Sequence, residues 1–228
     1  MIEPVQPIPT VVEPPIASWP EIRENGEPLA EMGGPRLVCR PVYAELGLEG
    51  ASERMLLRVG ALTRLNAAAE SLPSDLGFLV LDVHRPLVVQ KALWDWQERN
   101  VRAENPALSD DGVNERVGQF VAFPTGDPAR PTPHRTGGAV DLTIIHLATG
   151  EELPMGTAFD EATKRAVTDF LERFPEPPAT ENRRLLYAAM LGAGFVNYPG
   201  EWWHFEFGTR RWAAQTGADF ALYGGVDE

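Results

Sequence analysis

Near the end of the chain lies the segment Tyr198-Pro199-Gly200-Glu201-Trp202-Trp203-His204-Phe205-Glu206-Phe207, a proline–glycine turn that leads into an aromatic-rich strand. Positions i and i+3 of a regular strand point to opposite faces. Glu201 can therefore share a site with His204 only if it lies in the bend made by the proline and the glycine. A carboxylate in a turn beside a metal-binding histidine suits a hydrolase, which must activate water.

A second segment, residues 133–144, holds His134 and Asp141 seven positions apart, with Gly137 and Gly138 between them. The glycines permit a tight loop that brings His134 back over the start of the strand carrying Asp141. An aspartate within an apolar strand is costly to bury unless its charge is satisfied, and a divalent cation would satisfy it. With His204 these residues supply two imidazoles and one carboxylate, a donor set typical of catalytic zinc that also tolerates cobalt or nickel.

Each of these residues also has a structural interpretation. A single histidine on a strand is often only hydrogen-bonded, and Asp141 could pair with an arginine instead of a cation. His146 has neither a local carboxylate nor a glycine loop beside it, so we interpret it as structural.

Composition limits the classes of partner. The 228 residues are 43% hydrophobic and 23% charged, which suits one globular domain with a sizeable core. The formal net charge of −13 argues against nucleic acid and against anionic membrane surfaces, because both favour clustered lysine and arginine. The single cysteine, Cys39, cannot form an internal disulfide.

The N-terminal part of the chain is rich in proline. We expect residues 1–36 to form an arm that lies on the surface, and residues 37–228 to form a single domain. No positively charged start followed by an apolar run appears, and no stretch approaches the ~18 apolar residues of a membrane-spanning helix. The sequence therefore predicts a cytoplasmic protein that does not bind membranes.

Helical periodicity occurs in three segments, residues 52–72, 160–174 and 181–191. Asp160 is a candidate N-cap for the second of these helices. Residues 87–101 should form another helix, since Pro86 suits a first turn, and residues 113–121 a short one.

Strand patterns occur between these helices. Residues 76–83 are almost continuously apolar, as in a central strand buried on both faces, and residues 139–146 form the next strand. Residues 195–198 and 202–207 are expected to pair as a hairpin. Because strands and helices do not alternate regularly, we predict an α+β fold, with a small, mainly antiparallel sheet surrounded by helices.

At this point four motifs resemble one known family. The H-x-x-G-x-A-x-D pattern of residues 134–141 and the E-W-W-H of residues 201–204 are similar to the zinc D-alanyl-D-alanine dipeptidases. The D-V-H-R-P of residues 82–86 and the M-G-T-A-F-D of residues 155–160 agree with two further family segments. This family includes the vancomycin-resistance-type dipeptidases. It belongs to the lysostaphin, D-Ala-D-Ala metallopeptidase and hedgehog group, whose fold is therefore implied over roughly residues 38–210.

The resemblance also implies roles for the matching residues. His134, Asp141 and His204 would bind one zinc ion per chain. Glu201 would accept a proton from the attacking water and later donate it to the departing amine. Arg85 would stabilise the negative charge that develops on the scissile carbonyl oxygen, whereas its structural alternative is a salt bridge at a helix start.

Substrate recognition is implied for three more residues. Asp160 falls where the family binds the substrate's ammonium group, and its alternative is plain N-capping. Tyr43 would act likewise, although the residues after it depart from the family's usual Asn-Phe. Thr132 stands where many relatives carry serine, so it would contribute a hydroxyl to the pocket for the substrate carboxylate. These departures leave the preferred dipeptide open.

The sequence thus favours a zinc-dependent dipeptidase that hydrolyses D-Ala-D-Ala or a close relative with metal-activated water. One alternative is a carboxypeptidase of the same group that trims cell-wall peptides, which would need a cleft open at one end. Another is a non-catalytic, zinc-stabilised binding domain, which would have no chemical reason to keep Glu201 and Arg85 together. The sequence is compatible with a role in resistance and with a role in cell-wall recycling, and it predicts no particular oligomeric state.

Overall fold

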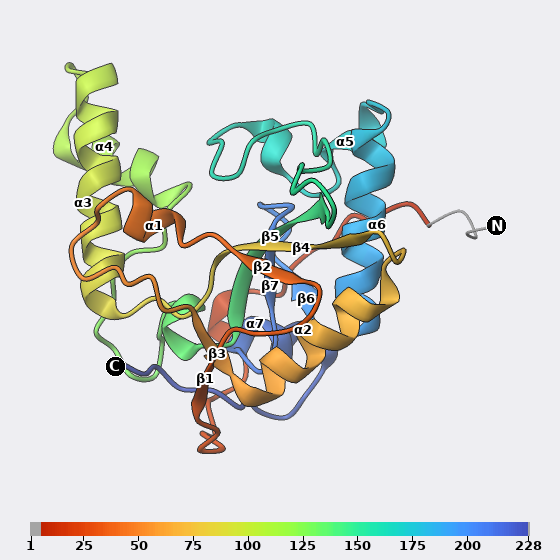
Figure 1. Ribbon diagram of the computed structural model, residues 1–228. Helices are drawn as coiled ribbons and strands as arrows, with labels where there is room; N and C mark the ends of the chain where they lie inside the picture. The colour runs from red at the N-terminus through yellow and green to blue at the C-terminus, as the bar shows by residue number, and fades with distance from the viewer. Residues whose placement is uncertain (1–5, 228) are drawn as a thin grey trace.

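A five-stranded sheet with the strand order β2-β4-β5-β7-β6 lies at the centre of the molecule (Figure 1). In the computed structural model, which describes residues 6–227, β4 (Leu76–Asp82) and β5 (Ala139–His146) are antiparallel. β2 (Leu37–Cys39) runs parallel to β4, whereas β7 (His204–Glu206) and β6 (Val196–Asn197) complete the other edge with antiparallel pairing. The predicted α+β class with a small, mainly antiparallel sheet is confirmed.

Helices lie on both sides of this sheet (Figure 1). α2 (Val59–Ser71) and α6 (Ala179–Gly192) supply side chains to the main core, whereas α3 (Leu87–Glu104) and α4 (Asp110–Gly118) share a separate apolar cluster. The shorter helical elements are α1 (Val42–Glu45), α5 (Phe170–Arg173), α7 (Arg210–Thr216), η1 (Ile16–Ser18), η2 (His134–Thr136) and η3 (Lys164–Ala166). Among residues 6–227, no helix has the length and apolarity needed to cross a membrane.

The two faces of the sheet have different contents. Val140 on β5 and Phe205 on β7 belong to the core that α2 and α6 cover. Side chains alternate along a strand, so Asp141, His204 and Glu206 point to the opposite face. The polar groups therefore gather on the side of the sheet that the main core leaves free.

Most of the predicted elements are confirmed. The strands expected at residues 76–83 and 139–146 correspond to β4 and β5, and β6 and β7 form the expected hairpin. The helices expected at residues 87–101, 113–121 and 181–191 correspond to α3, α4 and α6, with ends displaced by a few residues.

The helix predicted over residues 52–72 is present as α2, but its predicted start is seven residues too early. Residues Leu56–Arg58 form β3, which pairs antiparallel with β1 (Leu29–Glu31) of the N-terminal segment. The helix starts only at Val59, because backbone groups of the preceding residues are used in pairing with a distant strand.

The helix predicted over residues 160–174 is wrong, and so is the role of Asp160 as its N-cap. Asp160 has a left-handed φ of 57°, and only η3 and α5 interrupt an irregular segment. The buried guanidinium of Arg183 donates to the carbonyl oxygens of Met155, Arg165 and Val167. The carbonyls of Arg165 and Val167 would accept backbone hydrogen bonds if residues 160–174 were a helix. Because they accept from Arg183 instead, Arg183 stabilises the irregular backbone.

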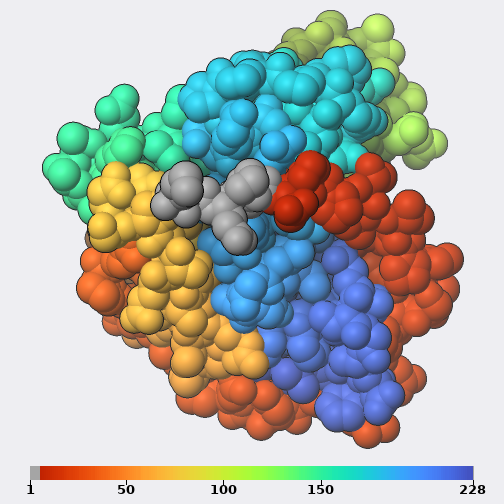
Figure 2. Space-filling model, turned by 90° about the vertical axis from the view of Figure 1, so that its right-hand side faces the viewer, coloured from red at the N-terminus to blue at the C-terminus, as the bar shows by residue number. Residues whose placement is uncertain are grey.

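The proline-rich arm was predicted over residues 1–36, of which residues 1–5 lie outside the described part of the chain. Residues 6–22 follow the surface beside the residues around α5 and α7 (Figure 2), whereas residues 29–31 pair with β3. The Ile8 amide donates to Glu172, and Arg210 on α7 donates to the carbonyls of Trp19 and Pro20. Ile22 forms a β-bridge with Ala221, so contacts with the C-terminal part of the chain extend along the arm.

Gly138 allows the loop before β5 to approach the end of β7. A Cβ added there would lie 2.4 Å from the Phe207 carbonyl oxygen and 2.8 Å from Cδ2 of Tyr223. We expect Gly138→Ala to lower the free energy of unfolding by about 1–3 kcal/mol, the usual cost of overpacking, as measured by denaturant titration. Gly192→Ala is the control, because no atom lies within 4 Å of its added Cβ, and it should leave stability unchanged or slightly raised.

Candidate active site

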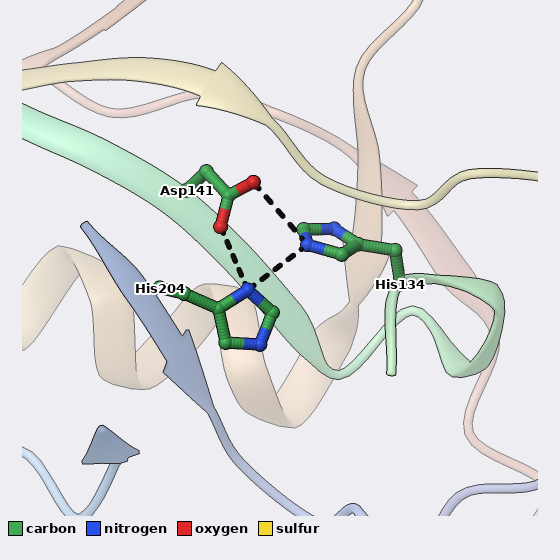
Figure 3. A group of neighbouring side chains, drawn as sticks. All are labelled: His134, Asp141 and His204. Atoms are coloured by element: carbon green, nitrogen blue, oxygen red, sulfur yellow. Dashed lines mark hydrogen bonds and ion pairs between the residues drawn. The ribbon is translucent and has the colours of Figure 1, made fainter. Parts of the chain in front are cut away.

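Three side chains from separate elements meet on the polar face of the sheet (Figure 3). Asp141 on β5 lies directly across from His204 on β7, and His134 reaches them from η2. Nδ1 of His204 is 2.8 Å from Oδ1 of Asp141, and Nε2 of His134 is 3.3 Å from Oδ2 of the same carboxylate. The two imidazole nitrogens are 3.2 Å apart, and all three residues are buried.

The loop between His134 and Asp141 has the form that its glycines allow. Gly137 ends η2 with a left-handed φ of 69°, and β5 begins two residues later. The carbonyl of His134 accepts a hydrogen bond from the backbone amide of Arg85 at 3.2 Å, which anchors the turn to the end of β4. Turn and strand thus hold His134 over the start of β5.

The outward nitrogens of both imidazoles have hydrogen-bond acceptors. Nδ1 of His134 is 2.7 Å from the Val83 carbonyl oxygen, and Nε2 of His204 is 3.0 Å from Oε1 of Glu206. Because a carbonyl and a carboxylate only accept, the outward nitrogens donate and the inward nitrogens keep their lone pairs in the neutral rings. Two such nitrogens and one carboxylate oxygen, with their ligand atoms within 4.8 Å of one another, fit a zinc ion.

Electrostatics also favours a cation at this point. Burial alone would raise the pKa of Asp141, but the two neighbouring histidines outweigh it and hold that pKa well below its usual range. Burial would likewise lower the pKa of each imidazole, yet the Asp141 carboxylate raises it to about 10 for His134 and to about 9 for His204. Protons and a metal ion therefore compete for the same nitrogens, so metal affinity should fall as the pH falls.

Glu201 lies in the turn before β7, as its spacing predicted. Its amide donates to the Tyr198 carbonyl at 3.1 Å, and its Oε2 is 3.9 Å from Nδ1 of His204. Burial raises the pKa of Glu201 to about 7, and the Asp141 carboxylate contributes to the rise although His204 opposes it. A carboxyl group that titrates near neutral pH can both accept and donate a proton during a reaction.

Arg85 follows β4 and is held by two neighbours. Its Nε and Nη2 donate to Oδ2 of Asp82 at 3.0 and 2.6 Å, and its Nη1 donates to Gln90 at 2.9 Å. The salt bridge considered as an alternative role is therefore present. Nη2 is also 3.9 Å from Oδ2 of Asp141, so the guanidinium borders the three-residue group as well.

The three residues assigned to substrate recognition lie nearby. The Tyr43 hydroxyl donates to Oδ2 of Asp160 at 2.9 Å. Desolvation in the cavity and the charge of Asp141 raise the pKa of Asp160 to about 6, although the bond from Tyr43 opposes the rise. The hydroxyl of Thr132 is buried and has no hydrogen-bond partner among the described residues. It could therefore bind a polar ligand group.

One cavity of about 470 Å³ joins all of these side chains. Its walls include every residue to which the sequence analysis gave a role in metal binding, catalysis or substrate recognition: Tyr43, Arg85, Thr132, His134, Asp141, Asp160, Glu201 and His204. A cavity of this size falls in the range of small-molecule sites. His146, in contrast, lies at the far end of β5, 3.9 Å from Asp75 and away from this cavity.

Sequence reasoning missed four residues that support the site. Asp82 contacts both Arg85 and His134, and its position at the end of an apolar strand was a signal that could have identified it. Glu206 follows His204 by two residues, so strand periodicity places both on one face. Gln90 and Arg211 lie on helices, and their local sequence contains no comparable signal.

A group of side chains that could hold a metal ion lies beside a buried acid and a buried arginine on an α+β scaffold, an arrangement that suits a metal-dependent hydrolase. Comparison with known proteins gives the family. The chain belongs to the D-Ala-D-Ala dipeptidase family, Peptidase M15, whose model matches residues 48–221. The resemblance noted from the four motifs is thereby confirmed.

Several known proteins are similar to this chain. The D-alanyl-D-alanine dipeptidase of Synechocystis sp. is 31% identical over 218 residues, which cover 85% of this chain and 87% of the relative. That of Escherichia coli is 34% identical over 154 residues, 67% of each chain. A solved mutant of the vancomycin resistance D,D-pentapeptidase VanY in complex with Zn(II) is 18% identical, with a TM-score of 0.48, covering 82% of this chain and 93% of that one.

Proposed function

We propose that this protein is a zinc-dependent dipeptidase that hydrolyses D-Ala-D-Ala or a closely related dipeptide, and that residues 37–228 form its single catalytic domain. The observation that carries the proposal is the convergence of His134, Asp141 and His204 in one cavity with Glu201 and Arg85. When bound, zinc supplies Lewis acidity that makes water a stronger nucleophile near neutral pH.

The chain's own residues then have distinct tasks. Glu201 orients the attacking water, accepts its proton and transfers that proton to the departing amine, which its pKa of about 7 supports. Arg85 presents a charge that cannot be deprotonated, and it is fixed by Asp82 and Gln90 before the substrate arrives. It stabilises the negative charge on the carbonyl oxygen of the scissile bond.

Asp160 and Tyr43 support a dipeptide rather than a longer peptide as the substrate. A carboxylate at the cavity wall can pair with the free ammonium group of a dipeptide, whereas an N-acylated peptide has no such charge. The test is a comparison of kcat/KM for D-Ala-D-Ala and for an N-acylated tripeptide ending in D-Ala-D-Ala, using the zinc-loaded protein. Preference for the acylated peptide would favour the carboxypeptidase alternative, and hydrolysis of neither would favour a binding domain.

The pKa of Asp160 gives the proposal a pH dependence. Because that pKa is raised to about 6, the carboxyl group becomes neutral below this pH and no longer pairs with an ammonium ion. We expect KM for the dipeptide to rise about tenfold for each unit of pH below this value. Asp160→Asn should have a high KM at all pH values and lack this dependence. A wild-type KM that stays constant from pH 7 to pH 5 would contradict the assigned role.

A cytoplasmic location and the absence of nucleic-acid or membrane partners stay predictions. Cell fractionation followed by immunodetection would test the location directly.

A further inference from the structure

The orientation of His204 depends on a buried carboxylate that is not among the proposed metal ligands. Nε2 of His204 is 3.0 Å from Oε1 of Glu206, whose side chain has no exposed surface. The two residues lie two positions apart on β7 and so share one face of the strand. Glu206 therefore fixes the ring and keeps its proton on Nε2, which leaves Nδ1 for the cation.

Glu206 is itself held by two donors from the following turn and helix. Arg211 Nη1 donates to Oε1 of Glu206, and the Thr209 hydroxyl donates to Oε2. A buried carboxylate is costly without a cationic partner. Arg211 supplies that charge and at the same time sets the direction from which Glu206 meets His204.

The position of Arg211 is determined by the proline-rich arm. Oε1 of Glu13 accepts a 2.6 Å hydrogen bond from Arg211 Nε and a 3.0 Å bond from Gln215 Nε2. The guanidinium carbon lies 5.1 Å from the ring centre of Trp19 on the arm and 4.3 Å from that of Tyr198 in the turn before Glu201. Arg211 thus contacts the arm on one side and the active-site turn on the other.

The arm is locally ordered around these contacts. Trp19 Nε1 donates to the Pro14 carbonyl at 2.9 Å, which closes the short turn that contains η1. Arg210, next to Arg211 on α7, donates to the Trp19 and Pro20 carbonyls at 2.9 and 3.0 Å. Figure 2 shows this part of the arm extending over the surface beside the C-terminal region. Glu13 and Trp19 are therefore presented to α7 from a fixed backbone.

We propose that the proline-rich arm is a positioning element of the metal centre, in which Glu13 fixes Arg211, Arg211 fixes Glu206, and Glu206 orients His204. This inference rests on the proposed metal site. Carboxylates that hold a ligating histidine typically contribute about 10- to 100-fold to metal affinity. Glu13 acts through one further residue, so its contribution should be smaller.

The test measures zinc affinity by competition with a chromophoric chelator at constant pH, using the full chain. Glu206→Gln should weaken zinc binding about 10- to 100-fold, and Glu13→Gln about three- to tenfold, by the same reasoning. Glu21→Gln is the matched control, because Glu21 is an exposed carboxylate on the same arm. The Glu21→Gln variant should bind zinc with the same affinity as the wild-type protein.

A double variant separates positioning from simple loss of negative charge. If Glu13 acts through Glu206, then Glu13→Gln has little further effect in the Glu206→Gln background. A through-space charge effect would instead persist there, and fully multiplicative losses would overturn the proposal. Equal zinc affinities of Glu13→Gln and Glu21→Gln would also overturn it. If the wild-type protein did not bind zinc, the proposed function itself would be wrong. Failure of the proposed function can therefore be told apart from failure of the proposal about the arm.

Discussion

Replacing Glu201 with glutamine should lower kcat for D-Ala-D-Ala by about 10²- to 10⁴-fold, the usual contribution of a general base, while zinc is retained. Glutamine keeps the shape of the side chain but cannot accept the proton of the attacking water. In the wild type, Oε2 of Glu201 lies 3.9 Å from Nδ1 of His204, beyond hydrogen-bond range. The substitution should therefore leave the proposed metal ligands in place. Steady-state kinetics and measurement of bound zinc by atomic absorption test both halves of the prediction.

Glu181→Gln provides the control for this variant, since Glu181 is an exposed acid in the first turn of α6. It should have wild-type kinetics. Near-wild-type turnover by Glu201→Gln would refute the assigned mechanism, and an unchanged zinc content alone would not rescue it.

Replacing Arg85 with lysine should lower kcat by about 10²- to 10³-fold, as loss of a donor to a developing oxyanion does. Lysine keeps a positive charge but cannot reproduce the planar group that binds Asp82 with two nitrogens and Gln90 with a third. The charge would no longer be held in place beside the scissile carbonyl. Kinetics on D-Ala-D-Ala measure the loss, with exposed Arg102→Lys on α3 as the control.

The salt-bridge interpretation of Arg85 makes a different prediction. Asp82 contacts Arg85 and also lies 3.0 Å from Nδ1 of His134. If Arg85 had only a structural role, it would hold Asp82 in place, and Asp82 would in turn hold the proposed metal ligand His134. Arg85→Lys would then lose zinc and activity together, and its melting temperature would fall. Full zinc occupancy with greatly reduced kcat would support catalysis and exclude that interpretation.

The parts of the site that sequence could predict lie within short segments. Strand periodicity and the Gly137-Gly138 pair were enough to bring His134 over Asp141, since every step of that argument concerns neighbouring residues. The turn before His204 likewise determines where Glu201 lies. Local physics and the family motifs both led to His134, Asp141, Glu201 and His204. The roles of Arg85, Asp160, Tyr43 and Thr132 came from the motifs alone, and the structure brings all eight residues into one cavity.

The parts that sequence could not predict depend on distant partners. Residues 160–174 have helical periodicity, but Arg183 takes up carbonyls that a helix would need. The link from Glu13 to Arg211 spans 198 positions, and no local pattern in either segment indicates it. Long-range contacts, made by charged side chains here and by the backbone pairing of β1 with β3 at the start of α2, therefore account for the differences between the predicted and observed structures.

The alternation along β7 has a consequence for how this enzyme can vary. Phe205 packs in the core, whereas His204 and Glu206 face the proposed metal centre, and both neighbouring strands fix this pairing. Inserting or deleting one residue in this strand would exchange the two sets, placing an imidazole in the core and an aromatic ring in the cavity. Selection for a stable core thus also preserves ligand geometry. Related chains can substitute residues here but should not change the length of the strand.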